Sequence, residues 1–360
     1  MTRRRLLLLS AHVLAACAIW LLAAPAARAT GDGLPSFLAD DEYWRIVTGF
    51  SERPGTFPSD NLLSNERLLQ EVIPELARIA RPNEVFLGVG PEQNFTYIAA
   101  LKPRMAFIVD IRRGNLDLHL MYKALFELSA DRAEFVSRLF SKSRPIGLSS
   151  TSSVSEIFDA YGAVDSSDSL YVESLRAIVA RLTKTHGFSL SADDMLRLQR
   201  THRAFYIYGP NIQYSSTRSG GRRDEPTYRD LMLATDSAGQ QRSFLASEEA
   251  FAFVKDLETS NLVVPLIGNF TGPKAIRAIA EYLAGKKSTV AAFYVSNVEE
   301  YLRREGTWNS FCANVATLPL DESSTFIRSV RETTPGARFR LLSELGGVAS
   351  EVKACEPKPE

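Results

Sequence analysis

Cysteine and histidine are scarce in this sequence, which limits the metal sites that it can form. The chain has three cysteines and four histidines among 360 residues. Cys17 lies in the first apolar segment, and Cys312 and Cys355 are too far apart in the sequence to predict a structural zinc site. His186 and His202 have neither the spacing of metal ligands nor a carboxylate cluster beside them. We therefore expect no metal cofactor.

An excess of charge of either sign is also missing. Lys and Arg number 42, and so do Asp and Glu, which gives a formal net charge of zero at pH 7. Because no long-range field results, neither nucleic acid nor a membrane surface is an expected partner. The sequence also lacks the hydrolase motifs G-x-S-x-G and H-E-x-x-H, so a hydrolase has little support.

The first residues predict export. Three arginines at positions 3–5 precede an apolar run over residues 6–24, and a small-x-small sequence at 27–29 precedes Thr30. This order is typical of a secretory signal peptide over residues 1–29, which predicts a periplasmic or extracellular protein. An uncleaved anchor that leaves the body outside is the alternative, and Sec and twin-arginine export both remain open. No comparable apolar run recurs, so we expect no membrane span in the mature chain.

Two cysteines remain after the predicted signal peptide. In an oxidising compartment Cys312 and Cys355 can form one disulfide. The alternative is a buried Cys312 and a free Cys355 in a C-terminal tail. The sequence leaves both possibilities open.

Residues 84–110 predict a strand, a helix and a second strand, and the rest of the chain is organised around this unit. A short apolar run reaches Gly88 and Gly90, a helix-length segment follows Pro91, and a second apolar run ends in Asp110. Parallel strands need such a crossover. The glycines let the backbone approach a ligand closely, and a helix that starts at proline has free N–H groups. We expect a small-molecule site at this turn, with Gly88, Gly90, Glu92, Gln93 and Asn94.

Asp110 and Arg112 extend the predicted site to the second strand. Asp110 lies 22 residues after Gly88, near the spacing of about 20 at which a carboxylate binds ribose hydroxyls. Arg112 follows at once, where its guanidinium can meet a phosphate or a carboxylate. Gln93 replaces the third glycine of G-x-G-x-x-G, which argues against a dinucleotide pyrophosphate. The alternative is that the glycines only join a strand to a helix, that Asp110 caps the next element and that Arg112 is solvated.

A second strand, helix and strand follow over residues 262–297. The first run reaches Asn269 and the last ends in Asn297. Together the two units predict an open sheet with a switch point, where ligands bind at the carboxyl ends of the strands. Asn269 and Asn297 should then converge with the glycine turn and Asp110. Pro265 argues against a central position for its strand.

The remaining segments predict helices and loops around this sheet. Asp60 and Asn61 can line a pocket mouth, Ser64 with Asn65 is expected to cap the next helix, and residues 213–226 form a partly basic loop. Helices are expected at 37–47, 68–79, 116–140, 170–182 and 192–200, strands at 203–208 and 324–330, and 298–320 should help to finish the sheet. The predicted divisions are 1–29 signal peptide, 30–83 helical lead-in, 84–142 first unit and long helix, 143–258 helical insertion or lid, 259–335 second unit, and 336–360 tail, disordered from 350.

Four segments, residues 88–103, 107–116, 245–251 and 292–299, are similar to a family of uncharacterised bacterial proteins. That family is described as having a methyltransferase-like Rossmann core, and the resemblance runs from about Tyr43 to Val330. It implies an α/β fold with a Rossmann-like, class I methyltransferase-like open sheet, a helical N-terminal lead-in and a helical insertion. It implies no assigned activity and no catalytic residue. Against the D-x-G-x-G-x-G pattern of methyltransferases, Phe86 replaces the acid and Glu92 the last glycine.

Two functions remain as hypotheses. The first is an S-adenosylmethionine-dependent methyltransferase, or a descendant that still binds the nucleoside, with Asp110 on the ribose. Methyl transfer depends mainly on positioning, so the lack of a catalytic triad is no objection. An exported protein, however, has no obvious supply of this cofactor. The second is a non-catalytic envelope binding protein on a degenerate Rossmann core, and the fold alone does not choose between them.

Overall fold

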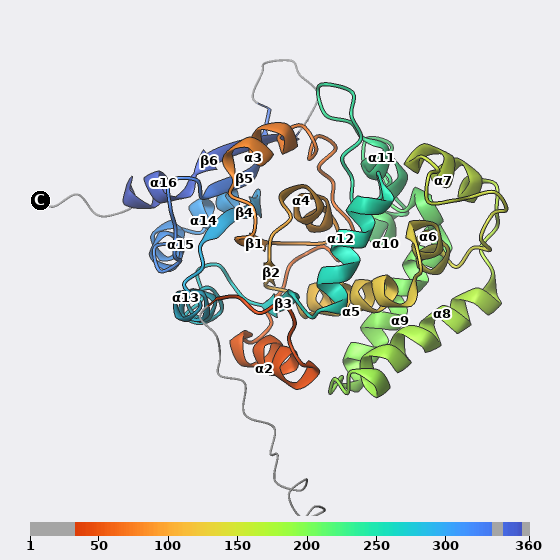
Figure 1. Cartoon of the computed structure of the whole chain (residues 1–360), viewed down its shortest axis with the longest axis horizontal. Coiled ribbons are helices and arrows are strands. Elements are labelled where there is room, and N and C mark those ends of the chain that lie inside the picture. The colour runs from red at the N-terminus through yellow and green to blue at the C-terminus, as the bar shows by residue number, and fades with distance from the viewer. Residues whose placement is uncertain (1–32, 333–340, 355–360) are drawn as a thin grey trace, which may run out of the picture. The chain divides into compact units, whose positions relative to one another are not determined.

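One six-stranded sheet forms the centre of the protein in the computed structural model, which describes residues 33–332 and 341–354. The strand order is β3-β2-β1-β4-β5-β6 (Figure 1). The strands are β1 Val85–Gly88, β2 Met105–Asp110, β3 Val263–Ile267, β4 Val290–Ser296, β5 Thr325–Arg331 and β6 Leu341–Gly347. The first five run parallel and β6 pairs antiparallel with β5. The predicted α/β class and the mostly parallel open sheet are confirmed.

The order of the strands reverses beside β1. This strand pairs with β2 on one side and with β4 on the other. The chain therefore extends the sheet in one direction up to β3, crosses back, and extends it in the other direction from β4. Pro265 lies in β3 at the edge of the sheet, where its missing N–H costs no ladder hydrogen bond.

Helices cover both faces of the sheet, which explains why its strands are continuous apolar runs. On one side lie α4 Gln93–Leu101, α5 Arg113–Leu128 and α12 Glu248–Thr259, and on the other α13 Ala275–Gly285, α14 Val298–Arg304 and α15 Trp308–Val315 (Figure 1). β1, β2 and β3 are buried along their whole length. The predicted alternation of strands and helices thus produces a sheet with both faces in the core.

The helical insertion packs beside α5 and not over the sheet (Figure 1). It contains α6 Arg132–Phe140, α7 Val154–Gly162, α8 Asp168–Ala180, the π-helix η1 Arg181–Thr185, α9 Ala192–Tyr208, the 3-10 helix η2 Gly209–Asn211, α10 Ser216–Ser219 and α11 Tyr228–Leu233. The lead-in contributes α2 Asp40–Phe50 and α3 Ile73–Ile79, and α16 Val348–Ala354 follows the last strand. Among the described residues no helix is both long and apolar enough to cross a bilayer.

Four predicted elements differ from the structure. The predicted strand at 203–208 is wrong, because these residues continue α9. The long helix at 116–140 is two helices, α5 and α6, and the Asp131 side chain caps the second by accepting from the Glu134 N–H at 2.8 Å. Residues 298–320 form α14 and α15 and add no strand to the sheet. The predicted tail contains β6 and α16.

One of the three cysteines lies in the described residues. Cys312, in α15, is disulfide-bonded. The alternative of an unpaired Cys312 thiol is therefore wrong. Cys17, Cys355 and the whole predicted signal peptide lie outside the described residues.

A cluster of buried charges joins the insertion to the core. The Lys123 ammonium lies 2.8 Å from a carboxylate oxygen of Glu127, and the other oxygen lies 2.7 Å from His186 Nε2. The second ring nitrogen of His186 lies 2.7 Å from Asp40. Glu258 is buried beside them and its carbonyl accepts from Lys123. The fold thus brings to His186 the carboxylates that its sequence neighbourhood lacks.

Candidate functional site

A crevice of about 240 Å³ lies at the carboxyl ends of β1 to β4. Of the predicted site residues, it is lined by Gly90, Gln93, Asp110, Arg112, Asn269 and Asn297. Both strand units therefore contribute to one hollow at the point where the strand order reverses. The other three predicted residues, Gly88, Glu92 and Asn94, do not line it.

Gly88 and Asn94 shape the turn between β1 and α4 without lining the crevice. A Cβ added to Gly88 would lie 1.9 Å from Asn94 Oδ1, so only glycine fits there. The Asn94 amide donates to the carbonyls of Val89, Gly90 and Pro91 at 3.0, 3.1 and 2.7 Å. Gly90 has φ +76°, in the left-handed region that favours glycine. Asn94 therefore holds the turn in shape and has no amide N–H to spare for a ligand.

Glu92 directly precedes α4 and does not line the crevice. Its carboxyl is fully buried just before α4, and one oxygen accepts from the Ser64 N–H at 3.1 Å. Burial raises the pKa of Glu92 to about 8, although hydrogen bonds from the backbone N–H groups of Ser64 and of Glu92 itself act to lower it. The start of a helix attracts anions. The Glu92 side chain makes no capping hydrogen bond to the start of α4, so it does not take the place of such an anion.

Asp110 and Arg112 form a buried ion pair on the wall of the crevice. Arg112 donates through Nε and Nη2 to the two Asp110 oxygens at 3.0 and 2.8 Å, and its backbone N–H donates to Asp110 at 2.8 Å. The guanidinium also donates to the Asp60 carbonyl and to Asn115. Both predicted residues therefore lie in the site, but each is largely engaged by the other.

The lead-in holds the second predicted turn in place. Glu52 accepts from the backbone N–H groups of Asn269, Lys274 and Ala275 at 3.2, 2.9 and 2.9 Å. The Asn269 side chain accepts from the Thr271 N–H at 3.0 Å, which stabilises the loop after β3. Asn297 precedes α14 without a capping hydrogen bond from its side chain. Both asparagines lie at the crevice as predicted.

Glu66 is a crevice residue that the sequence does not reveal. Its Oε1 accepts from the Tyr294 hydroxyl at 2.6 Å and from the Ser296 hydroxyl. Gln93 Nε2 donates to the same tyrosine oxygen at 3.1 Å. A chain of hydrogen bonds thus connects the glycine turn to this acid through β4. Glu66 comes from a loop with no regular structure, so no periodic pattern marks it.

Other lead-in residues around Glu66 also line the crevice. Asn61 does so, as predicted, whereas Asp60 contributes only its carbonyl to Arg112. Ser64 and Asn65 line it as well. The predicted helix cap at Ser64 and Asn65 is wrong, because α3 begins only at Ile73 and no side chain caps it.

Three buried oxygens on the crevice lining have no hydrogen-bond partner among the described residues. They are Asn61 Oδ1, Glu66 Oε2 and Gln93 Oε1. The orientation of the Gln93 amide follows from its Nε2, which faces the Val89 carbonyl as well as Tyr294. Buried polar atoms are normally hydrogen-bonded. A molecule that presents N–H or O–H groups would therefore suit this lining.

Aromatic side chains line another part of the crevice. The rings of Phe57 and Tyr301 meet edge to face with centroids 5.6 Å apart, and Phe270 and Tyr214 also line it. Tyr214 belongs to the predicted basic loop, so one residue of that loop reaches the site. Partial burial raises the pKa of Tyr214. Such rings offer apolar faces to a planar ligand.

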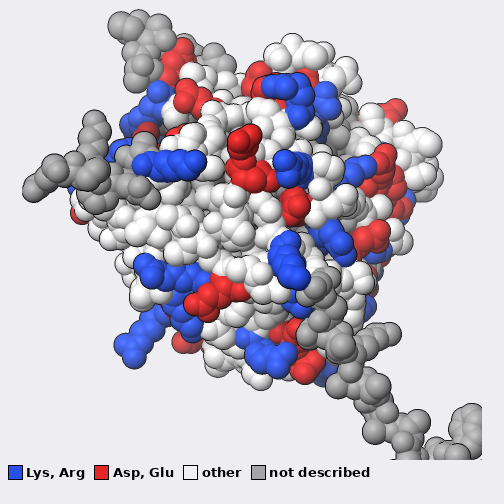
Figure 2. Space-filling view, turned by 60° about the vertical axis from the view of Figure 1, so that its left-hand side comes forward, with Lys and Arg blue, Asp and Glu red and all other residues white. Residues whose placement is uncertain are grey.

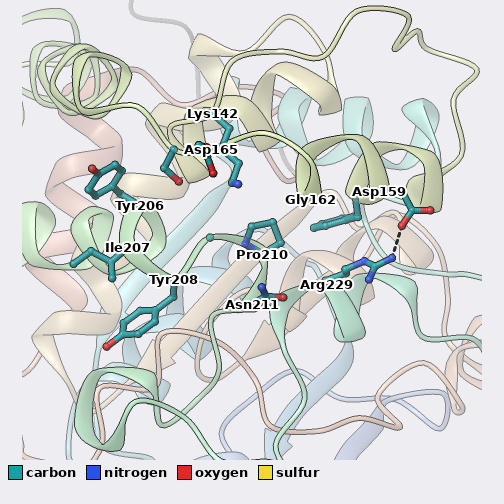
Figure 3. A pocket seen from close by; sticks show the side chains of 13 residues that line it. Lys142, Asp159, Gly162, Asp165, Tyr206, Ile207, Tyr208, Pro210, Asn211 and Arg229 are labelled. Atoms are coloured by element: carbon teal, nitrogen blue, oxygen red, sulfur yellow. Dashed lines mark hydrogen bonds and ion pairs between the residues drawn. The ribbon is translucent and has the colours of Figure 1, made fainter.

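A second hollow, of about 710 Å³, lies in the helical insertion between α7, the end of α9, η2 and α11 (Figure 3). It is larger than the crevice, but three of its charged side chains already have partners. Arg229 is paired with Asp159, as the dashed line in Figure 3 shows, and Lys142 donates to the Val164 carbonyl. Because the crevice combines unpartnered acceptors with the sheet's switch point, it is the stronger candidate.

Metal-binding groups and surface charge bear on the predictions of no metal and no polyanionic partner. No group of three or more His, Cys, Asp or Glu side chains is placed there to hold a metal ion. On the face shown in Figure 2, acidic and basic side chains are interspersed in small groups. That face therefore shows no extended patch of one sign of charge.

One family model matches most of the chain. It is described as Domain of unknown function (DUF7790), and it matches residues 62–191 and 214–347. The matched segments contain both strand units and most of the residues that line the crevice. No curated protein matches the chain.

Proposed function

The chain belongs to the DUF7790 family, and we propose that it binds a small nucleoside-like ligand, S-adenosylmethionine or a relative, in the crevice. The observation that carries this proposal is the pairing of unpartnered acceptor oxygens with aromatic rings in one hollow. Ribose hydroxyls and an amino group are donors that would satisfy Asn61, Glu66 and Gln93. The base would lie against Phe57 and Tyr301.

The sheet supports a Rossmann-like core of the methyltransferase type. Its order, β3-β2-β1-β4-β5-β6, matches the classic doubly wound order, although β6 is antiparallel. Ligands of such sheets bind at the switch point, beyond the carboxyl ends of the strands. The crevice lies at that point between β1 and β4.

The size of the crevice favours one nucleoside over a dinucleotide. Its volume of about 240 Å³ is below the roughly 300–1,000 Å³ that is usual for drug-sized ligands. Gln93 replaces the third glycine that close binding of a pyrophosphate needs. Both observations support a ligand without a phosphate chain.

A non-catalytic envelope binding protein on a degenerate Rossmann core is the second candidate. The ion pair between Asp110 and Arg112 favours it, because the carboxylate expected on the ribose is already bound within the protein. Export, with a signal peptide over residues 1–29, also fits a binding protein better than an enzyme that needs a cytoplasmic cofactor. Export and periplasmic location remain proposals from the sequence.

Thermal denaturation with candidate ligands tests the proposed function. S-adenosylmethionine, S-adenosylhomocysteine and adenosine should raise the melting temperature of the purified protein, whereas NAD should not. A ligand at 100 times its Kd stabilises the native state by about 2.7 kcal/mol. Tyr301→Ala should abolish the shift, and Tyr206→Ala, which alters the hollow in the insertion, should preserve it. If no adenosine compound shifts the native protein, the proposal is wrong.

A further inference from the structure

The charges on the crevice lining do not balance. Three acids line it, Glu66, Asp110 and Glu305, and among the described lining residues Arg112 is the only Lys or Arg. Arg112 is bound to both oxygens of Asp110. This ion pair is neutral as a unit, which leaves Glu66 inside the crevice and Glu305 at its exposed rim without a cation from the lining.

Glu66 is buried among hydroxyl groups. Tyr294 and Ser296 donate to one of its oxygens, and the Ser329 hydroxyl also acts on the carboxyl. No Lys or Arg of the described chain forms an ion pair with it. Ser329 lies near enough to lower its pKa, but it forms no hydrogen bond with Oε2 within the described chain. Burial raises the pKa of Glu66 even though the three hydroxyls act to lower it. A buried carboxylate without a cation is costly, so the proton stays on Glu66 until a cation arrives.

The same crevice holds aromatic rings that attract cations. Phe57, Tyr214 and Tyr301 line it together with Glu66. The face of an aromatic ring attracts an ammonium or similar cation within about 6 Å of its centre. An acid beside several rings is therefore a suitable environment for an organic cation.

We propose that the ligand carries a cationic group, an ammonium or a sulfonium, and that Glu66 binds it as the counter-ion. Glu66 gives up its carboxyl proton to the solvent on binding, and the bound cation replaces it, so charge is conserved at the site. This inference rests on the proposed function and specifies the ligand class within it. Glu66 is then the residue that distinguishes a charged ligand from an uncharged analogue of the same shape.

Proton release makes the affinity for a cation depend on pH. One proton leaves for each ligand bound. At pH values below the pKa of free Glu66, the affinity therefore rises about tenfold for each unit by which the pH increases. An uncharged analogue that leaves the proton in place should bind equally well across the same range. Proton release is therefore the signature that separates a counter-ion from a simple wall residue.

Isothermal titration calorimetry with two adenosine compounds provides the test. The probes are S-adenosylmethionine, which has a sulfonium, and 5′-methylthioadenosine, which has an uncharged thioether and no amino-acid group. As the pH rises above the usual carboxyl value of 4.5, S-adenosylmethionine should bind more tightly, because the pKa of Glu66 is raised. Its binding heat should also vary with the ionisation enthalpy of the buffer, because a proton is released. Methylthioadenosine should show neither effect.

Two variants and one control make the result specific. Glu66→Gln should remove the pH dependence and weaken S-adenosylmethionine binding at least tenfold at pH 7, while methylthioadenosine binding changes less than twofold. Tyr294→Phe removes one hydrogen bond to Glu66 and should move the pH dependence to higher pH, which provides a test if Glu66→Gln does not fold. Glu300→Gln removes an exposed acid of α14 outside the crevice and should change nothing.

The outcomes separate this inference from the proposed function. If neither adenosine compound binds, both are wrong. If both bind with equal affinity and without proton release, the crevice binds nucleosides but Glu66 is not the counter-ion of a cation. If the pH dependence persists in Glu66→Gln, another group releases the proton and the assignment to Glu66 is overturned.

Discussion

Glu258 and Glu127 are neighbouring buried glutamates. Replacing each by Gln should change the free energy of unfolding in opposite directions, with Glu258→Gln stabilising the fold and Glu127→Gln destabilising it at neutral pH. Burial raises the pKa of Glu258 to about 8, although the charge of Lys123 acts to lower it. For Glu127, burial acts to raise the pKa, but the hydrogen bond from His186 and the charge of Lys123 together lower it. In the native protein Glu258 is therefore expected to be protonated at pH 7 and Glu127 to be ionised.

The sign of each effect follows from the two pKa directions. A carboxyl with a raised pKa stabilises the fold fully below its unfolded value, and this contribution is lost as the pH rises through the folded value. For Glu258 the window runs from 4.5 to about 8. At about 1.4 kcal/mol for each pH unit, the loss is on the order of 5 kcal/mol. Glu258→Gln should match the native protein below pH 4.5 and exceed its stability by several kcal/mol at pH 8.

Glu127→Gln is the matched comparison. Its pKa is lowered, so the stability that it contributes is present above 4.5 and is lost as the pH falls below that value. Removing the charge leaves Lys123 buried without its 2.8 Å ion-pair partner, at a cost of about 3 kcal/mol. This variant should therefore be less stable than the native protein at pH 7.

Urea denaturation followed by circular dichroism at pH 5, 6, 7 and 8 measures both effects. The free energy of unfolding of Glu258→Gln, relative to the native protein, should increase steadily over this series. A difference that stays constant with pH, or that decreases, would refute the reasoning that Glu258 keeps its proton in the folded state. Equal stability changes in the two variants would show that the Lys123 ammonium does not discriminate between the two carboxylates.

Two further predictions concern the crevice itself. Gly88→Ala should destabilise the fold by several kcal/mol in thermal denaturation, because the added Cβ would overlap the Asn94 side chain. Gly114→Ala in α5 is the control, since nothing lies within 4 Å of its added Cβ, and it should stabilise the fold by about 0.5–1 kcal/mol. Equal effects of the two substitutions would contradict the role of Gly88. Asp110→Ala should lower the free energy of unfolding in urea by about 3–5 kcal/mol, because it leaves Arg112 buried without its ion-pair partner, and an unchanged value would show that the pair is dispensable.

The position of the site could be predicted because it depends on local patterns. Apolar runs of strand length, each followed by a turn and a helix, fix which residues end each strand. Parallel strands joined by crossovers all end at the same edge of the sheet, so Gly90, Asp110, Asn269 and Asn297 had to approach one another once the order was right. The prediction of a strand at 203–208 was wrong because the pattern there is short, and a short apolar run does not distinguish a strand from a helix. Five apolar and aromatic residues after Arg203 suit a strand, but the capping box at Ser191 starts a helix that continues through them.

The contacts between side chains could not be predicted in this way. His186 has no acid near it in sequence, and its two carboxylate partners come from α2 and α5, which are 146 and 59 residues away. A search by spacing along the chain cannot detect such a cluster. Only the packing of the insertion against the core brings these charges together.

The spacing from Gly88 to Asp110 predicted where a strand ends. It could not predict whether the Asp110 carboxylate is free to bind a ligand. Whether an acid can bind a ligand depends on which groups already bind it, and Arg112 turns back over Asp110 from only two residues further on. Glu66 is the opposite case. It lies in an irregular loop and was not predicted, yet it lines the crevice and one of its buried oxygens has no partner among the described residues. Loops commonly carry binding residues on a rigid sheet, and the acid that we propose as the counter-ion comes from the lead-in. Exchanging the 57–66 loop should therefore alter ligand preference more than any change within β2.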